Sequence, residues 1–244
     1  MLDIYGKPLV VHVLSGLANA GYARSVVNAA YLSEAFSNLS EAASPLGLDV
    51  MLSVQPEPYQ HAGDLAFANP LWETLGQDEV FLAANGDTLA EIDSGELGLL
   101  AQEVTVECPI MILGDAILDG PLRVRDGQLV GIGNLDYPTR SERLSDLERW
   151  DDAGLKLMHS SLKPHLVEPG TTMSFHGENG LVGRVVASGG SILVREAPIL
   201  DRAEIGTVKD YESRETNTHL RELVDRINAE RLRQMNQSGR SKAS

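Results

Sequence analysis

The stretch Val80-Phe81-Leu82-Ala83-Ala84, followed directly by Asn85-Gly86-Asp87, indicates the fold class. A short apolar run that ends at a turn is typical of a strand buried on both faces of a parallel sheet. In sheets of this kind, residues just past the carboxyl end of a strand lie at the edge where ligands bind. Asp87 is therefore the first candidate site residue.

Short apolar strands and amphipathic helices alternate on the amino-terminal side of this stretch. The spacing of apolar residues predicts helices over 7–21, 31–39 and 64–75, and strands over 25–28 and 48–54. This alternation implies βαβ crossovers. We therefore expect an α/β protein whose first half is a doubly wound, mainly parallel sheet flanked by helices.

The second half of the sequence has a mixed α+β character. It predicts strands over 105–113 and 191–194, a hairpin over 123–130 with Asp126-Gly127 at the turn, a surface excursion over 137–152, a helix over 180–187 and a closing helix with apolar residues Leu220, Leu223, Val224 and Ile227. We expect one domain over residues 1–237, divided near residue 103, and a disordered tail over 238–244.

Composition narrows the class of partner. The 244 residues include 20 Lys and Arg against 35 Asp and Glu, a net charge of −15, which argues against binding to nucleic acid or an anionic membrane. A bound divalent metal could still attract an anionic small molecule. The single cysteine, Cys108, excludes an internal disulfide framework. No apolar run is long enough to span a bilayer and no leader is visible, so we expect a soluble, cytoplasmic protein.

Asp87 is a candidate ligand of Mg²⁺, because one fixed carboxylate together with substrate phosphates is a common way to hold this ion. The alternative is a βα turn that only bends the chain. A second acidic residue, Glu204, precedes Ile205-Gly206-Thr207 and could supply another carboxylate. The same segment also reads as a turn into the last helices, with Thr207 as N-cap and Asp210 in the first turn.

The loop after the strand over 48–54 is a candidate nucleotide-binding segment. Gln55 could pair with a base through its amide, and Gly63 would let a flat ligand approach the backbone. The alternative is a proline-rich connector, in which His61 is a surface histidine. Three basic residues, Lys156, Lys163 and Arg195, could meet a phosphate, although scattered basic residues usually face solvent.

Taken in order, these segments resemble the sugar-1-phosphate nucleotidyltransferases. The resemblance rests on Ile4-Tyr5-Gly6-Lys7-Pro8-Leu9-Val10, Leu17-Ala18-Asn19-Ala20-Gly21, Val26-Val27-Asn28, Gln55-Pro56-Glu57-Pro58 with Gly63, Asn85-Gly86-Asp87, and Glu204-Ile205-Gly206-Thr207 with Asp210-Tyr211. It implies a Rossmann-like, nucleotide-diphospho-sugar transferase-like fold, with a nucleotide-binding half over 1–103 and a sugar-binding half over 104–237. It also implies the joining of an NTP and a sugar 1-phosphate to give an NDP-sugar and pyrophosphate.

Carried over by position, the resemblance implies that Asp87 and Glu204 bind Mg²⁺ and that Gln55, Gly63 and Asn85 meet the nucleotide. It assigns no catalytic residue. Members of the family open with a strand and a glycine-rich phosphate-binding loop, and here Met1 falls just after that motif. We therefore expect little or no transferase activity from the sequence as written.

Two other functions stay open at this point. The first is a noncatalytic nucleotide-sugar-binding partner or regulatory subunit, paired with itself or with a paralogous active subunit. The second is a metal-dependent glycosyltransferase, which would favour an Asp-x-Asp motif, whereas Asn85-Gly86-Asp87 supplies one acidic residue.

Overall fold

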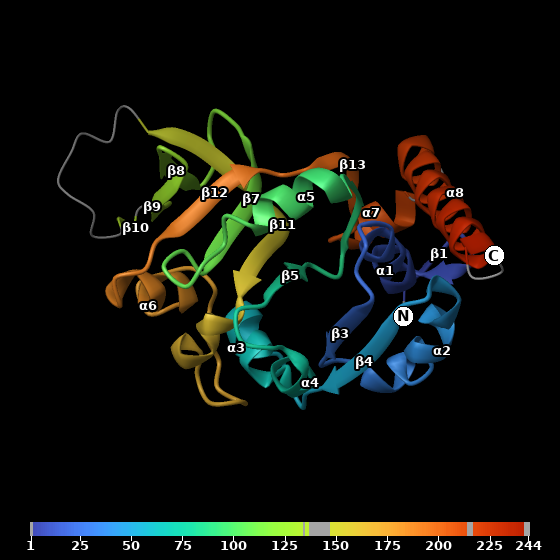
Figure 1. The fold of residues 1–244 in the computed structure, drawn as a ribbon, viewed down its shortest axis with the longest axis horizontal. Helices are drawn as coiled ribbons and strands as arrows, with labels where there is room; N and C mark the ends of the chain where they lie inside the picture. Colours follow the sequence, from blue (N-terminus) through green and yellow to red (C-terminus); the bar gives the residue numbers. More distant parts are fainter. Residues whose placement is uncertain (1, 134, 137–146, 214–216, 242–244) are drawn as a thin grey trace. The chain divides into compact units, whose positions relative to one another are not determined.

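The computed structural model of the chain describes residues 2–133, 135–136, 147–213 and 217–241. The chain forms two units, and each is assembled from separate stretches of sequence (Figure 1). The first unit contains residues 1–52, 85–97 and 198–244, and the second contains residues 53–84 and 98–197. These boundaries do not coincide with the predicted division near residue 103.

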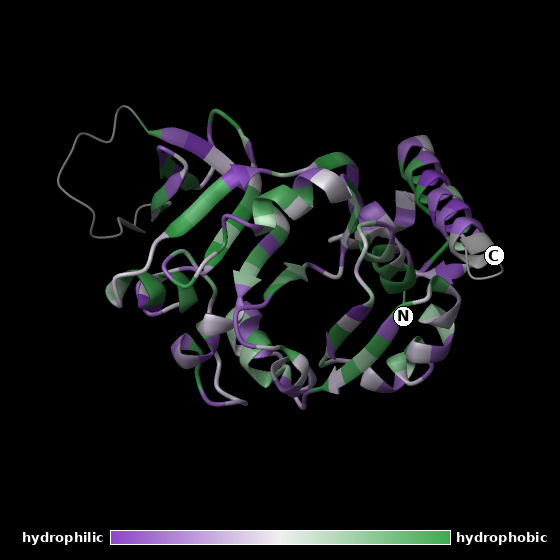
Figure 2. Cartoon of the chain, viewed as in Figure 1, coloured by the Kyte–Doolittle hydropathy of each residue, from purple (hydrophilic) through white to green (hydrophobic). Residues whose placement is uncertain are grey.

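The second unit is built on a seven-stranded sheet with the order β10-β9-β12-β7-β11-β5, in which β8 also pairs with β11 and β9. The strands are β5 (Val80–Ala84), β7 (Ile110–Ala116), β8 (Leu122–Arg125), β9 (Gln128–Ile132), β10 (Leu135–Asp136), β11 (Glu148–His159) and β12 (Ile192–Glu196). Figure 2 shows predominantly hydrophobic residues along β12. The hairpin turn between β8 and β9 has positive φ at both Asp126 and Gly127, as the sequence predicts.

The large sheet is mixed rather than mainly parallel, which corrects the prediction. β7 and β12 are parallel, whereas β11 runs antiparallel to β5, to β7 and to β8. Consequently β5, β7 and β12 all point the same way, and β11 lies between two of them in the opposite direction. The predicted surface excursion over 137–152 is wrong from Glu148 onward, where β11 begins, and residues 137–146 lie outside the described part of the chain.

Helices cover the sheet of the second unit and close its core. They are α3 (Gln60–Phe67), α4 (Asn69–Thr74), α6 (Leu181–Ala187) and the 3₁₀ helix η4 (Ser160–His165), while α5 (Ser94–Ala101) crosses the boundary between the units. The predicted single helix over 64–75 is divided, because Pro70 occupies the first turn of a new helix, α4. Fully buried side chains such as Ile110, Ile112 and Leu162 form the core.

The first unit packs helices around three two-stranded sheets. Its elements are β1 (Asp3–Ile4), β2 (Lys7–Pro8), α1 (Leu9–Asn19), β3 (Arg24–Ala29), η1 (Ser33–Phe36), α2 (Leu39–Ala43), η2 (Ser44–Leu46), β4 (Asp49–Val54), β6 (Thr88–Ile92), β13 (Ile199–Glu204), α7 (Val208–Ser213) and α8 (Thr218–Ser241). β4 extends two residues into the second unit. The predicted helix over 31–39 is replaced by η1 and α2. The tail predicted to start at Ser238 is helical as far as Ser241.

Helix α1 has apolar residues on two sides and therefore lies between two clusters. Leu9 and Val13 pack with residues of α8, whereas Val11 and Leu14 pack with α2 and β4. Gly16 permits close approach to β6, since a Cβ atom there would lie 2.6 Å from the carbonyl oxygen of Ala90. α1 thus holds β6 tightly against the core of the first unit.

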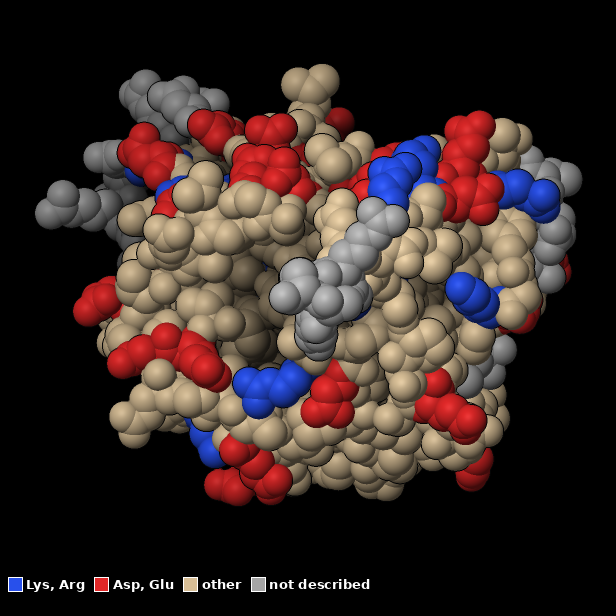
Figure 3. Space-filling model, turned by 45° about the vertical axis from the view of Figure 1, so that its right-hand side comes forward, with Lys and Arg blue, Asp and Glu red and all other residues tan. Residues whose placement is uncertain are grey.

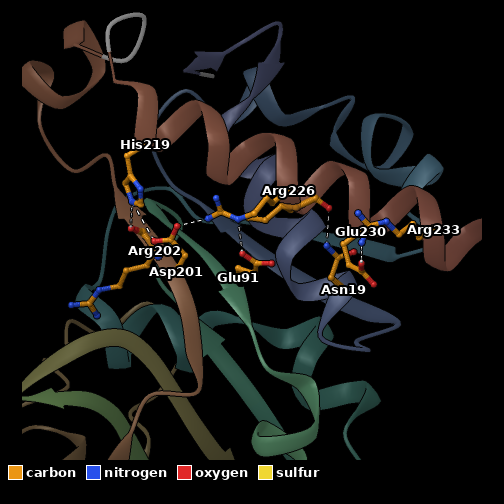
Figure 4. Close-up of polar contacts among 9 residues, drawn as sticks. Asn19, Glu91, Asp201, Arg202, His219, Arg226, Glu230 and Arg233 are labelled. Carbon is orange, nitrogen blue, oxygen red and sulfur yellow. Dashed lines mark hydrogen bonds and ion pairs between the residues drawn. The ribbon is translucent and has the colours of Figure 1, made fainter.

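Helix α8 is fastened to β6 and β13 by charged side chains (Figure 4). Arg226 Nε donates to Glu91 Oε2 at 3.0 Å, and its Nη2 donates to Asp201. His219 Nε2 lies 3.3 Å from Asp201 Oδ1. The side chain of Asn19 on α1 adds a hydrogen bond of 2.8 Å to the carbonyl oxygen of Ile227. Figure 2 shows both hydrophobic and hydrophilic residues on α8, as expected for a helix with one face buried.

Acidic side chains outnumber basic ones on the face shown in Figure 3, where Asp and Glu gather in several groups. This agrees with the net charge of −15. No helix within the described residues is both long enough and apolar enough to cross a membrane.

Several strands have an edge without a strand partner among the described residues, and β5, β3 and β4 are among them. β5 ends the large sheet, since it pairs only with β11. In the first unit β3 and β4 pair only with each other.

Candidate functional site

Asp87 and Glu204 belong to two segments of the first unit that pair with each other. Asp87 immediately precedes β6, Glu204 is the last residue of β13, and Glu204 is the register partner of Thr88. The backbone N–H of Ile205 donates to the carbonyl oxygen of Asp87 at 3.0 Å. A Cβ atom on Gly206 would lie 3.4 Å from Asp87 Oδ2, so the Asp87 carboxylate reaches the segment that follows Glu204.

These two carboxylates have the chemistry that Mg²⁺ requires. Both residues are exposed, and within the described residues neither takes part in an ion pair or a side-chain hydrogen bond. Mg²⁺ is usually held by one or two carboxylates, with waters and substrate phosphates completing an octahedron. The described residues contain no group of three or more His, Cys, Asp or Glu arranged for a metal. The pair therefore suits a metal that arrives with a phosphate ligand.

The turn after Glu204 has the capping structure that the sequence predicts. Thr207 N and Oγ1 both donate to Asp210 Oδ2, at 3.0 and 2.7 Å, while Asp210 N donates to Thr207 Oγ1 at 3.2 Å. This reciprocal arrangement is a capping box that starts α7. The prediction that Thr207 is an N-cap and that Asp210 lies in the first turn is therefore confirmed. These capping hydrogen bonds do not use the side chain of Glu204.

Gln55 presents an acceptor without a partner in the second unit. Its side chain is almost completely buried, and its Nε2 donates to Asp64 Oδ1 at 2.7 Å. Gln55 Oε1 is buried and accepts no hydrogen bond among the described residues. A buried amide oxygen without a partner is costly, which suits a group that a ligand satisfies.

Asp64 is the residue that orients this amide, and the sequence did not single it out for that role. Its Oδ1 accepts from Gln55 Nε2 and also from the backbone N–H of Tyr59, both at 2.7 Å. Because a carboxylate only accepts, it forces the Gln55 amide to turn its NH₂ inward and leaves the oxygen free.

The absence of a side chain at Gly63 is needed for packing within the second unit. Gly63 N donates to Met173 O at 3.0 Å, and a Cβ atom there would lie 2.6 Å from Thr171 O and 2.7 Å from the Cβ of Tyr59. The residue is buried against its own chain. Its predicted contact with a nucleotide stays a prediction.

Two further residues that the sequence singled out are Asn85 and His61. Asn85 is half-buried, belongs to the first unit, and its carbonyl oxygen accepts from Thr88 N at 3.4 Å. His61 is exposed, in line with its interpretation as a surface histidine. Asn85, Asp87 and Glu204 therefore belong to the first unit, and Gln55 and Gly63 to the second.

Of the three basic candidates, Lys156 differs from the expectation that such residues face solvent. Lys163 is exposed, and Arg195 pairs with Glu103 at 2.7 Å and donates to the carbonyl oxygen of Gly127. The side chain of Lys156, by contrast, is only 8% exposed and lies 2.9 Å from Asp152 Oδ2. The alternation of side chains along β11 could have predicted that Lys156 lies on a buried face. The strand itself was not predicted, because residues 137–152 were interpreted as a surface excursion.

A pocket of about 350 Å³ lies beside α8 in the first unit. It is lined by Glu91, Asp225, Arg226, Ala229, Glu230 and Arg233. Arg226 already pairs with Glu91 and Asp201, and Arg233 with Glu230. The pocket is therefore a gap between side chains that are already paired, and we assign it no ligand.

Comparison with known proteins identifies relatives by sequence. A stretch of 94 residues is 36% identical to the N-acetylmuramate alpha-1-phosphate uridylyltransferase of Neisseria meningitidis serogroup B, and covers 38% of this chain and 39% of that protein. A stretch of 113 residues is 28% identical to a probable mannose-1-phosphate guanylyltransferase 1 of Oryza sativa subsp. japonica, and covers 46% of this chain and 31% of that protein. The matches thus span well under half of these relatives. No family model matches the chain.

The match to solved structures with the same fold extends over a larger share of each chain than the match to the relatives found by sequence. HddC from Yersinia pseudotuberculosis superposes with a TM-score of 0.63 at 18% identity, covering 88% of each chain. A putative glucose-1-phosphate thymidylyltransferase from Bacillus anthracis, solved with a sucrose, gives a TM-score of 0.63 at 13% identity, covering 88% of this chain and 84% of that one. Over these stretches the chain is therefore similar in sequence to sugar-1-phosphate nucleotidyltransferases, as its motifs predict, and it shares the fold of these solved structures.

Proposed function

We propose that this chain binds an NTP and a sugar 1-phosphate and joins them to give an NDP-sugar and pyrophosphate. The observation that carries the proposal is that Asp87 and Glu204, at the paired ends of β6 and β13, are exposed and have no ion-pair partner among the described residues. The relatives named as uridylyl- and guanylyltransferases support the same reaction class.

Asp87 and Glu204 would hold Mg²⁺ in this proposal. When bound, Mg²⁺ offsets the charge that builds on phosphate oxygens during phosphoryl transfer. The two strands contribute rigidity, because β6 is pressed against α1 at Gly16 and β13 is fastened to α8 through Asp201. Fixed carboxylates lose less entropy on binding a metal than mobile ones do.

Gln55 would bind the base. Its free Oε1 can accept an N–H from a base edge, and Asp64 holds the amide in the orientation that offers it. An amide of this kind pairs with several bases, so the choice among UTP, GTP and TTP is left to experiment.

The test is pyrophosphate release by the purified chain with Mg²⁺, each of these NTPs and a panel of sugar 1-phosphates. In keeping with the low transferase activity expected from the sequence, we expect slow release that requires both substrates and Mg²⁺ and that is lost in Asp87→Asn. The variant Asp225→Asn, which changes an exposed acidic residue of the first unit outside the carboxylate pair, is the matched control.

Other outcomes would replace the proposal. Binding of a nucleotide sugar without release of pyrophosphate would favour a noncatalytic binding partner, and hydrolysis of a nucleotide sugar would favour a glycosyltransferase. A chain that binds neither nucleotide nor Mg²⁺ would overturn the proposal altogether.

A further inference from the structure

The second half of helix α8 exposes apolar side chains. Within the described residues, the buried apolar side chains of this helix all lie in its first half and are Leu220, Leu223, Val224 and Ile227. In the second half, Leu232 is 62% exposed, and Met235, about one turn further along, is 40% exposed. Leu232 therefore lies on the side of α8 that faces away from the core of the first unit.

The last turns of α8 extend past its contacts with the core. Gln234 still anchors the helix, because its Nε2 donates to the carbonyl oxygen of Asn19 at 3.2 Å. Residues 235–237, by contrast, are all exposed, yet the helix continues to Ser241. Helical ends without tertiary packing are marginal in water, so a partner that covers this part of α8 would stabilise it.

Charge changes sign along the exposed side of α8. Spacings of three or four residues place on one stripe of the helix the residues Glu222, Asp225, Ala229, Leu232 and Asn236. The stripe begins with two exposed carboxylates and has its small and apolar residues in the middle. Beyond them, residues 231–244 contain four Lys or Arg and no Asp or Glu, whereas the rest of the chain holds 16 basic and 35 acidic residues.

This pattern is complementary to a second copy of itself in the antiparallel direction. A two-fold axis at Leu232 would place the start of each α8 beside the end of the other, so the carboxylates of one copy face the basic end of its partner. The same axis sets Met235 of the partner subunit against Ala229, which pairs a large side chain with a small one. A parallel pair would instead bring like charges together.

Other occupants fit this surface less well. The net charge of −15 disfavours both nucleic acid and an anionic membrane. A helix that lies in a lipid interface needs a broad apolar face, and the exposed half of α8 offers two large apolar side chains, Leu232 and Met235. A second copy of this chain supplies both the apolar contact and the complementary charge.

We propose that the exposed side of α8 is a dimer interface, in which a second copy of the chain packs its own α8 antiparallel with Leu232 at the two-fold axis. One helix from each copy makes a small interface, so the dimer is weak and reversible. The proposal does not depend on the transfer reaction, because α8 carries none of the residues assigned to that reaction.

Sedimentation equilibrium of the full chain over a range of concentrations tests the interface. We expect a monomer–dimer equilibrium that weakens at high salt. The variant Leu232→Asp, which brings two carboxylates together at the axis, should raise the dissociation constant at least about tenfold. Its fold should be retained, since Leu232 is exposed. The matched control is Leu200→Asp, which changes a 67% exposed leucine of the first unit outside α8 and should dimerise as the wild type does.

Cross-linking by mild oxidation tests the direction of the two helices. The background is Cys108→Ser, which removes the single native thiol. In this background Leu232→Cys should form a disulfide-linked dimer, because the two copies of this residue meet at the axis. Glu222→Cys should not, because ten residues at 1.5 Å each on both sides of the axis separate its two copies by roughly 30 Å.

Three results would overturn the proposal. The first is a wild-type chain that stays monomeric at every concentration tested. The second is a Leu232→Asp variant that dimerises as tightly as the wild type, which would place any dimer contact elsewhere on the chain. The third is cross-linking of Glu222→Cys as fast as that of Leu232→Cys, which would exclude the antiparallel pair.

Discussion

Asp64 illustrates how one carboxylate can determine what a neighbouring amide offers to a ligand. Its Oδ1 accepts from Gln55 Nε2 and from Tyr59 N, both at 2.7 Å, and this leaves Gln55 Oε1 free. The sequence identified Gln55 as a candidate because an amide can pair with a base. It could not identify Asp64, since the hydrogen bond between them depends on the turn that the loop makes.

Substituting Asp64 by Asn should weaken nucleotide binding by about tenfold, a loss on the order of one hydrogen bond. An Asn side chain can donate as well as accept, so the Gln55 amide is no longer held in one orientation. Binding is measured by fluorescence with a labelled nucleotide. The variant Glu57→Gln, at an exposed position in the same loop, serves as the control. An unchanged affinity in Asp64→Asn would contradict the role assigned to it.

His12 gives the first unit a pH-dependent stability. The side chain is buried in α1, its Nε2 donates to Ile4 O at 2.8 Å, and its Nδ1 has no partner among the described residues. Burial lowers the pKa of His12 below its ordinary value of 6.5, although the bond to Ile4 opposes this. The folded state therefore holds the neutral ring, while the unfolded chain takes up a proton near pH 6.5.

We expect the free energy of unfolding to be constant above the ordinary pKa of His12 and to decrease as the pH falls from 6.5 toward its lowered value. Urea unfolding between pH 5 and 8 measures this. The variant His12→Gln should lose that part of the pH dependence, whereas His61→Gln, at an exposed position, should keep it. An identical profile in His12→Gln and the wild type would show that His12 does not titrate on unfolding.

At the scale of elements, exposed ion pairs contribute to the attachment of helix α8 to β6 and β13. Arg226 reaches both Glu91 on β6 and Asp201 on β13, the two strands that lead to Asp87 and Glu204. Exposed ion pairs are screened by salt, so their contribution is largest at low ionic strength. The apolar face of α8, including Leu220 and Leu223, supplies the contact that salt does not weaken.

The variant Arg226→Gln should lower the thermal midpoint in 50 mM salt, and the difference from the wild type should shrink in 1 M salt. Hydrogen exchange of the β6 amides should also become faster, because the strand loses a tie to α8. Arg233→Gln is the matched control, since Arg233 pairs only with Glu230 on the same helix among the described residues. A salt-independent loss in Arg226→Gln would mean that packing, rather than charge, was disturbed.

Elements with a clear apolar period were predicted well, whereas those shaped by charge or by 3₁₀ turns were not. The predicted strand over 80–84 matches β5, and the predicted helix over 180–187 is α6 but for its first residue. β11 was not predicted at all, because Asp151, Asp152 and Lys156 interrupt the apolar pattern of a strand. Side chains that form an ion pair within a bulge give no periodic signal.

For the whole molecule, the sequence predicted the class but not the division into units. The α/β character and the similarity to nucleotidyltransferases follow from segments in their order along the chain. The two units, however, interleave, since residues 85–97 and 198–244 return to the first unit. A return of this kind depends on pairing between distant strands, such as β6 with β13, and local sequence does not encode it.

The same limit applies to the candidate site. Asp87 and Glu204 are 117 positions apart, and the β6–β13 pairing brings their backbone segments close to each other. That the two carboxylates bind one metal ion stays a prediction of the resemblance. Lys156 and Asp152 are four residues apart, and no resemblance pointed to them. Motif order therefore suggested Asp87 and Glu204, whereas the proximity of Lys156 and Asp152 required coordinates.

The free side of β5 has a consequence for handling the protein. Its five apolar residues present one row of backbone N–H and C=O groups to no neighbouring strand within the described chain. Such a row can template the addition of a foreign strand. Concentrated solutions should therefore be prone to form ordered aggregates that begin at this strand, and additives that disfavour intermolecular sheets should prolong the useful life of a preparation.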